Sequence, residues 1–246
     1  MADLTHLSLF SGIGGLDLAA EWAGFRTVGQ CEWADYPTKV LEKHWPNVPR
    51  WRDIRTLTKE SFYVRTGLRT VDIISGGFPC QPFSSSGKRR GAEDDRYLWP
   101  EMLRVIEELK PSWVVGENVA GIVSLALDKV LSDLENQGYE TRAFLLPACA
   151  VNAPHRRDRV AIVANSKKDN GNYGRTQEKR NNREETPLEH RGRTWWDAES
   201  GVCRVVDGVS TRVDIDRDEC LGNAVVPQQF YPVFRAIAEM EGGRSV

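Results

Sequence analysis

The sequence predicts an α/β fold built on a mostly parallel sheet. Three short β-branched runs, at residues 27–31, 71–75 and 112–116, are typical of strands that are buried on both faces. Stretches with helical spacing of apolar residues precede two of them, at 16–23 and 97–109. Strands that alternate with helices favour a parallel sheet covered on both faces.

Composition supports a globular protein and excludes several classes. The chain has 246 residues, 40% hydrophobic, which is enough for one large core domain. No apolar run reaches the length of a membrane span, and the first residues do not resemble a signal peptide. Five cysteines without a CxxC pair argue against a zinc site and a disulfide framework, so a reducing cytoplasm is expected. A net charge of −2 restricts any nucleic-acid contact to local basic patches.

The first unit of the chain is a strand, a glycine turn and a helix. Residues 7–10 predict the strand, 11–15 the turn, and a helix follows that ends at Gly24. This order is the usual opening of a nucleotide-binding sheet. The dinucleotide pattern, however, requires a third glycine where Asp17 stands, which disfavours NAD or FAD.

The second predicted strand ends in an acidic and an aromatic residue, Glu32 and Trp33. A carboxylate at this place can accept hydrogen bonds from both hydroxyls of a ribose, and an indole offers a flat face to an adenine. The same residues would also suit an ordinary strand end with a partly buried tryptophan. Both interpretations stay open on this pattern alone.

A single cysteine, Cys80, lies between Pro79 and Pro82 in the loop that follows the strand at 71–75. Two glycines before it free the backbone, and the prolines fix its direction. A lone cysteine is more often a small buried hydrophobe than a nucleophile. The polar residues at 84–90 disfavour that interpretation, and a rigid loop at the carboxyl end of a strand is where a nucleophile is expected.

The second half of the chain contributes a strand end, a basic turn and a polar insertion. The strand at 112–116 ends in Glu117 and Asn118, and a helix at 127–136 is followed by Gly138. A basic turn at 152–159 leads into a further strand. From 165 to about 202 the composition becomes polar, so 167–185 is either a disordered, solvated insertion or part of a binding region. A last amphipathic helix is expected at 229–241.

Several of these segments together resemble the DNA (cytosine-5) methyltransferase family. Pro79-Cys80-Gln81-Pro82-Phe83-Ser84 resembles its catalytic loop, and Glu117-Asn118-Val119 its next signature. Four further matches lie at 10–15, 53–54, 154–159 and 221–228, and all six segments occur in the same order as in the family. His155 replaces a glutamine that is usual in the basic segment, so the role of that side chain stays open.

The resemblance implies a Rossmann-like sheet that binds S-adenosylmethionine, with a small, irregular target-recognition region. The catalytic and cofactor-binding domain would cover 1–164, the recognition region 165–218, and a returning C-terminal segment 219–246. The implied reaction is methyl transfer to C5 of a flipped cytosine in duplex DNA, with S-adenosylhomocysteine as the product. Cys80 would add to C6, Glu117 would bind the N3 edge, and Arg157 would contact O2.

The resemblance also assigns the remaining site residues. The implied catalytic residues are Cys80, Glu117, Asn118, Arg157 and Arg159, with Asn118 orienting the loop. The implied cofactor contacts are Phe10, Gly12, Gly14, Gly15, Leu16, Glu32, Trp33, Asp53, Ile54, Pro79, Asn223 and Ala224. The implied DNA contacts are Ser84, Lys88, Arg89, Arg90 and Arg204. No metal is expected.

Three other functions are compatible with parts of the pattern. A tRNA cytosine-5 methyltransferase would share these motifs, and a catalytically silent DNA-binding regulator would share the fold. An oxidoreductase using Cys80 with a nicotinamide is disfavoured by Asp17. The expected partner is double-stranded DNA, the expected state a monomer, and a companion restriction endonuclease is compatible with the resemblance.

Overall fold

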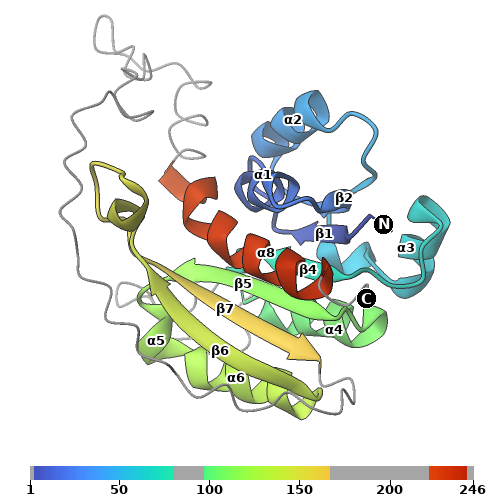
Figure 1. Ribbon diagram of the computed structural model, residues 1–246. Coiled ribbons are helices and arrows are strands. Elements are labelled where there is room, and N and C mark those ends of the chain that lie inside the picture. Colours follow the sequence, from blue (N-terminus) through green and yellow to red (C-terminus); the bar gives the residue numbers. More distant parts are fainter. Residues whose placement is uncertain (1–2, 80–96, 167–221, 243–246) are drawn as a thin grey trace, which may run out of the picture.

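A computed structural model describes residues 3–79, 97–166 and 222–242, which form one seven-stranded sheet flanked by helices (Figure 1). The strand order is β3-β2-β1-β4-β5-β7-β6. Neighbours from β3 to β5 run parallel, whereas β7 is antiparallel to both β5 and β6. The strands are β1 Thr5–Leu9, β2 Arg26–Cys31, β3 Arg50–Trp51, β4 Ile73–Gly76, β5 Trp113–Val119, β6 Tyr139–Leu146 and β7 Arg159–Ser166.

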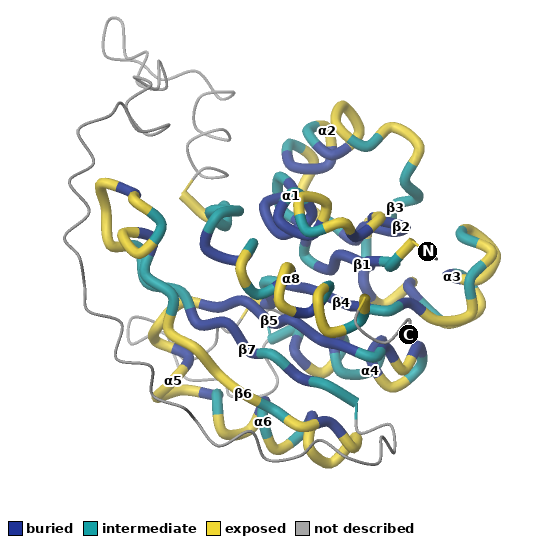
Figure 2. The backbone as a smooth tube through the Cα atoms, viewed as in Figure 1, coloured by how far each residue is buried: buried dark blue, intermediate teal, exposed yellow. Residues whose placement is uncertain are grey.

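The helices form a layer on each face of this sheet. The helical elements are α1 Gly15–Trp22, α2 Asp35–His44, η1 Ile54–Thr56, α3 Lys59–Thr66, α4 Trp99–Leu109, α5 Ile122–Leu125, α6 Leu127–Asn136, η3 Ala148–Val151 and α8 Pro227–Gly242. One core contains side chains of α1 and α8, and the other contains side chains of α3, α4 and α6. Figure 2 shows the central strands as the buried layer between them.

Helix α8 brings the end of the chain back onto the first unit. It packs beside α1, and its side chains Phe230, Phe234 and Ile237 are at most 1% exposed. Burial of a large apolar side chain contributes about 1.5–3 kcal/mol. These three contacts therefore fix α8 firmly, and with it the segment that precedes it.

The expected α/β fold is confirmed, with differences at particular elements. β5 extends to Val119, so Glu117 and Asn118 lie inside the strand and not beyond its end. β6 was not predicted, because most of its side chains are exposed and its sequence lacks a clear alternation. No helix in the described part of the chain is long and apolar enough to cross a membrane. The division into three regions stays a prediction, since 167–221 lie outside the described residues.

Successive strands are added first on one side of β1 and then on its other side. The chain adds β2 and β3 on one side of β1, and then crosses to place β4 and β5 on the other side. In open α/β sheets such a switch point leaves a crevice beyond the carboxyl ends of the strands. The loops that follow β1 and β4 therefore border the same crevice.

A buried polar cluster lies beneath α1. The Asp17 carboxylate accepts hydrogen bonds from Ser8 Oγ and Gln30 Nε2, both at 2.8 Å. Burial raises the pKa of Asp17 to about 6, although these two hydrogen bonds oppose the shift. His6 lies nearby on β1, and burial lowers its pKa to about 3. The sheet therefore carries a carboxylate and an imidazole whose charged forms are both disfavoured.

We expect Asp17→Asn to stabilise the protein increasingly as the pH rises from 4 to 6. The raised pKa of Asp17 means that its contribution to stability is full below about 3.8 and is lost as the pH approaches about 6. The loss amounts to about 3 kcal/mol. Asparagine stays neutral, and Ser8 can rotate its hydroxyl to accept from it. Urea unfolding at pH 4, 5, 6 and 8 measures the difference between variant and parent.

This difference isolates Asp17, because His6 titrates equally in both proteins. A difference in unfolding free energy that does not change with pH would show that Asp17 is not the titrating group.

Candidate active site

A cavity of about 1280 Å³ opens at the carboxyl ends of β1, β2, β4 and β5. It is the place that the reversal of strand order predicts for a ligand. Most of the residues assigned from the sequence line it, and they come from segments that are distant in the chain. These residues are Phe10, Gly12, Gly15, Leu16, Glu32, Trp33, Asp53, Ile54, Pro79, Glu117, Asn118, Arg159, Asn223 and Ala224.

The loop after β1 is held against the end of β2. The backbone N–H of Ser11 donates to the carbonyl of Cys31 at 3.0 Å. The N–H of Gly12 donates to Glu32 Oε2 at 2.7 Å, and that of Ala34 donates to Glu32 Oε1 at 2.8 Å. Two donors thus fix the orientation of the Glu32 carboxylate, whose remaining lone pairs can accept from a ligand.

Trp33 places an open aromatic face at the rim of the cavity. Its side chain is 72% exposed, which is unusual for a tryptophan in a folded protein. Arg52, which also lines the cavity, donates to the Trp33 carbonyl at 2.6 Å and pairs with Asp35 at 2.5 Å. The backbone of Trp33 is therefore fixed while its ring stays available for stacking on a planar ligand.

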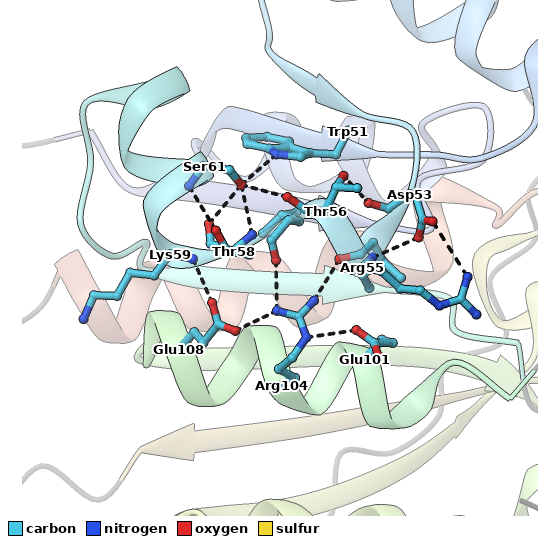
Figure 3. A network of polar contacts seen from close by, with 12 residues as sticks. Trp51, Asp53, Arg55, Thr56, Thr58, Lys59, Ser61, Glu101, Arg104 and Glu108 are labelled. Carbon is cyan, nitrogen blue, oxygen red and sulfur yellow. Dashed lines mark hydrogen bonds and ion pairs between the residues drawn. The ribbon is translucent and has the colours of Figure 1, made fainter.

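The segment that carries Asp53 is fixed from below by α4 (Figure 3). Arg104 donates to the carbonyls of Ile54 at 2.9 Å and Leu57 at 3.1 Å. Asp53 itself accepts from the N–H of Arg55 at 2.9 Å and so begins the short η1 turn. Asp53 thus lines the cavity just beyond β3, with its Oδ2 3.8 Å from Arg55 Nη1.

A buried ion pair forms the opposite wall. Arg159 Nε lies 2.8 Å from Glu117 Oε1, and the side chains are only 12% and 11% exposed. Burial raises the pKa of Glu117, and the positive charges of Arg159 and Arg157 partly oppose this shift. A side chain at Gly77 would lie 2.7 Å from Glu117 Oε2, so any larger residue there would require this carboxylate to shift.

Asn118 fixes the chain as it leaves β4. Its side-chain Nδ2 donates to the carbonyl of Phe78 at 2.9 Å. Phe78 is 2% exposed and packs against the Trp99 ring, with ring centroids 4.9 Å apart. The chain entering the Cys80 loop thus passes directly beside Glu117. Cys80 itself lies outside the described residues.

Two assigned residues lie elsewhere than expected. Arg157 does not line the cavity, because its guanidinium donates to the backbone carbonyls of Gly222 and Ala224. Gly14 also stays outside the lining, and it packs against the ring of Trp45, which a side chain at Gly14 would approach to 2.5 Å. The expected DNA contacts Ser84, Lys88, Arg89, Arg90 and Arg204 fall outside the described residues. No group of three or more potential metal ligands is found among the residues that the structure describes.

Comparison with protein families agrees with this arrangement. The model of the C-5 cytosine-specific DNA methylase family matches residues 4–205, which is most of the chain. The chain belongs to this family. The match includes Glu32, Cys80 and Glu117.

Individual methylases show the extent of the similarity. The Type II methyltransferase M.NgoFVII of Neisseria gonorrhoeae is 35% identical over 162 residues, covering 64% of this chain and 42% of the relative. M.HhaI of Haemophilus parahaemolyticus is 32% identical over 168 residues, covering 66% and 49%. The solved structure of the S. pombe Dnmt2 methyltransferase shares the fold, with a TM-score of 0.57 and 24% identity over 68% of this chain and 52% of that one. The chain therefore spans less than half the length of these two Type II relatives.

Several supporting residues of this site were not found from the sequence. Gly77, Arg52 and Arg104 shape the cavity through close approach or hydrogen bonds to backbone carbonyls. The second glycine of the Gly76-Gly77 pair was a usable signal, because a strand end needs only one glycine to turn. The two arginines gave none, since a backbone carbonyl leaves no trace in the sequence.

We expect Arg159→Met to destabilise the protein more at pH 8 than at pH 5. Removal of one partner of a buried ion pair typically costs about 3–5 kcal/mol, because the other charge stays buried. Without Arg159 the pKa of Glu117 rises further above its usual value. The stability contributed by the protonated carboxyl is then lost as the pH rises through that higher pKa. Urea unfolding at both pH values measures the effect.

The double variant Glu117→Gln, Arg159→Met is the matched control. It should recover most of the loss at pH 8, because no charge is left in the pair. Equal destabilisation of the single and the double variant at both pH values would show that packing, and not charge, explains the loss.

Proposed function

We propose that the protein transfers a methyl group from S-adenosylmethionine to C5 of cytosine in a specific sequence of duplex DNA. The observation that carries the proposal is the shared cavity. It brings the Glu32 and Trp33 end of β2 together with the buried Glu117–Arg159 pair of β5 and β7. The loop that bears Cys80 begins between them, at the end of β4.

The chemistry of one wall fits an adenosine-containing cofactor. Glu32 is held as a double acceptor, which suits the two hydroxyls of a ribose. Trp33 offers its exposed ring to an adenine, and Asp53 offers an acceptor to the adenine amino group. When bound, S-adenosylmethionine supplies an electrophilic methyl group. Gly12 leaves open space beside the loop, because a side chain there would meet nothing within 4 Å.

The other wall suits a cytosine that has left the base stack. The Cys80 thiolate forms a bond to C6, and the electron pair of the C5–C6 double bond moves toward C5. Glu117 hydrogen-bonds the N3 edge, and its raised pKa favours a shared proton there. After C5 has gained the methyl group, loss of the C5 proton and departure of the thiolate restore the double bond.

The contact to O2 of the cytosine is assigned differently from the sequence interpretation. Arg157 was expected there, but its Nη2 donates to the backbone carbonyls of Gly222 and Ala224. Arg159 lines the cavity beside Glu117. We therefore assign O2 to Arg159, which would stabilise negative charge that develops on that oxygen.

Recognition of DNA rests on residues outside the described ranges. Lys88, Arg89 and Arg90 carry positive charge that suits phosphates, and Ser84 and Arg204 are further contacts in the proposal. The relatives carry the name Type II methyltransferase. A companion restriction endonuclease is proposed on that similarity.

The first expected result concerns the cofactor wall. Glu32→Ala should weaken binding of S-adenosylmethionine by roughly 1.5–3 kcal/mol, because a charged acceptor is lost. Glu32→Gln keeps the shape and should lose less. Titration calorimetry on the free protein measures both, and an unchanged dissociation constant for Glu32→Ala would remove Glu32 from the site.

The function itself is tested by bisulfite sequencing of DNA from cells that express the chain. We expect protected cytosines at one defined sequence, and none in cells expressing Cys80→Ser, because a serine hydroxyl supplies almost no anion at neutral pH. RNA from the same cells is treated in parallel. Protected cytosines in tRNA instead of DNA, or equal protection with the Cys80→Ser protein, would overturn the proposal.

A further inference from the structure

The segment that precedes α8 is held by hydrogen bonds at Arg157. Nη2 of Arg157 donates to the carbonyls of Gly222 and Ala224, both at 2.6 Å. The Arg157 carbonyl accepts from Gln229 Nε2 at 2.9 Å, and the same amide donates to the Leu146 carbonyl at 2.9 Å. Arg157 thus contacts both ends of the short segment 222–229, through its side chain and through its backbone.

The opposite side of this segment rests on the loop after β1. A side chain at Gly15 would lie 2.5 Å from the carbonyl oxygen of Val225, so the two backbones are in direct contact. Asn223, Ala224 and Val225 line the same cavity as Gly15. The segment 223–225 is therefore a wall of the cavity, fixed between the β1 loop and Arg157.

The side chains of Arg157 and Arg159 have different partners although only one residue separates them in the sequence. Arg157 has a φ of 35°, in the left-handed region, and its side chain does not reach the cavity lining. Arg159 begins β7 and pairs with Glu117 inside the cavity. Each guanidinium has its own partners, Glu117 for Arg159 and the carbonyls of the wall for Arg157.

We propose that Arg157 is a positioning residue for the cofactor, which acts by holding the 223–225 wall against the β1 loop. The inference rests on the proposed function, because it names the cofactor of that site. Loss of Arg157 should loosen the wall and weaken cofactor binding. It should lower kcat at saturating cofactor much less than it raises KM, because Arg157 hydrogen-bonds the wall and acts on Glu117 only through its charge.

The experiment compares Arg157→Met, Arg157→Lys and the matched control Arg156→Met. Arg156 is the neighbouring arginine, its side chain is 77% exposed, and it pairs with Asp158 at 2.8 Å. The first readout is amide hydrogen exchange of the 222–229 peptide in the free protein, with β1 amides as a measure of global folding. The second is the dissociation constant for S-adenosylmethionine from calorimetry, and the third is the pair of steady-state parameters KM for the cofactor and kcat.

We expect faster exchange at 222–229 and about tenfold weaker cofactor binding for Arg157→Met, with β1 protection retained. KM for the cofactor should rise by a larger factor than kcat at saturation falls. Arg157→Lys should be intermediate, since an ammonium can reach one carbonyl, and it decides the matter if Arg157→Met does not fold. Arg156→Met should behave as the parent.

Two results would overturn the inference. Unchanged exchange and unchanged cofactor affinity in the Arg157 variants would show that the wall does not depend on this residue. A fall in kcat with unchanged KM for the cofactor would show that Arg157 acts on the cytosine and not on the cofactor wall. Failure of the proposed function is recognised separately, because the parent protein would then bind no S-adenosylmethionine while hydrogen exchange still reports on the wall.

Discussion

The position of β1 at the point where the strand order reverses is the constraint on which the site depends. The loops leaving β1 and β4 diverge to opposite faces of the sheet, and the cavity lies between them. Two glycines permit close approaches in the wall of the cavity. A side chain at Gly15 would lie 2.5 Å from the Val225 carbonyl oxygen, and one at Gly77 would lie 2.7 Å from Glu117 Oε2. Larger side chains at either place would separate segments that must act together.

The carboxylates in and near the site are buried, and burial of a charged group lowers the stability of the folded protein. Burial raises the pKa of Asp17 to about 6 and also raises the pKa of Glu117. Asp17 stabilises the fold, because it joins α1 to both β1 and β2 close to the loop that follows β1. Glu117 lines the cavity, and within the described part of the chain it pairs with Arg159. A carboxyl with a raised pKa and one cation is suited to exchange a proton with a ligand, whereas one with two neutral donors is suited to fix a loop.

The sequence allowed prediction of the sheet and of most of the cavity lining, because both depend on local signals. Short β-branched runs identify central strands, and glycine or acidic residues at their ends identify the crevice. The edge strand β6 was missed, since pairing with β7 along its whole length holds it in place and its side chains mostly face solvent. α2 and α3 were missed for a similar reason, as few of their residues are buried. Arg52 and Arg104 act on backbone carbonyls, which no residue pattern records.

The placement of Arg157 shows how a backbone conformation decides the task of a side chain. Arg157 and Arg159 would share one face if both belonged to a regular strand. β7, however, begins only at Arg159, and the positive φ of Arg157 turns its side chain out of the strand pattern. A left-handed conformation at a residue other than glycine costs roughly 1–2 kcal/mol. Three hydrogen bonds through Arg157, two from its guanidinium and one to its carbonyl, are sufficient to offset that cost. The strain is therefore maintained by the C-terminal segment itself, so the 223–225 wall and the turn before β7 stabilise each other.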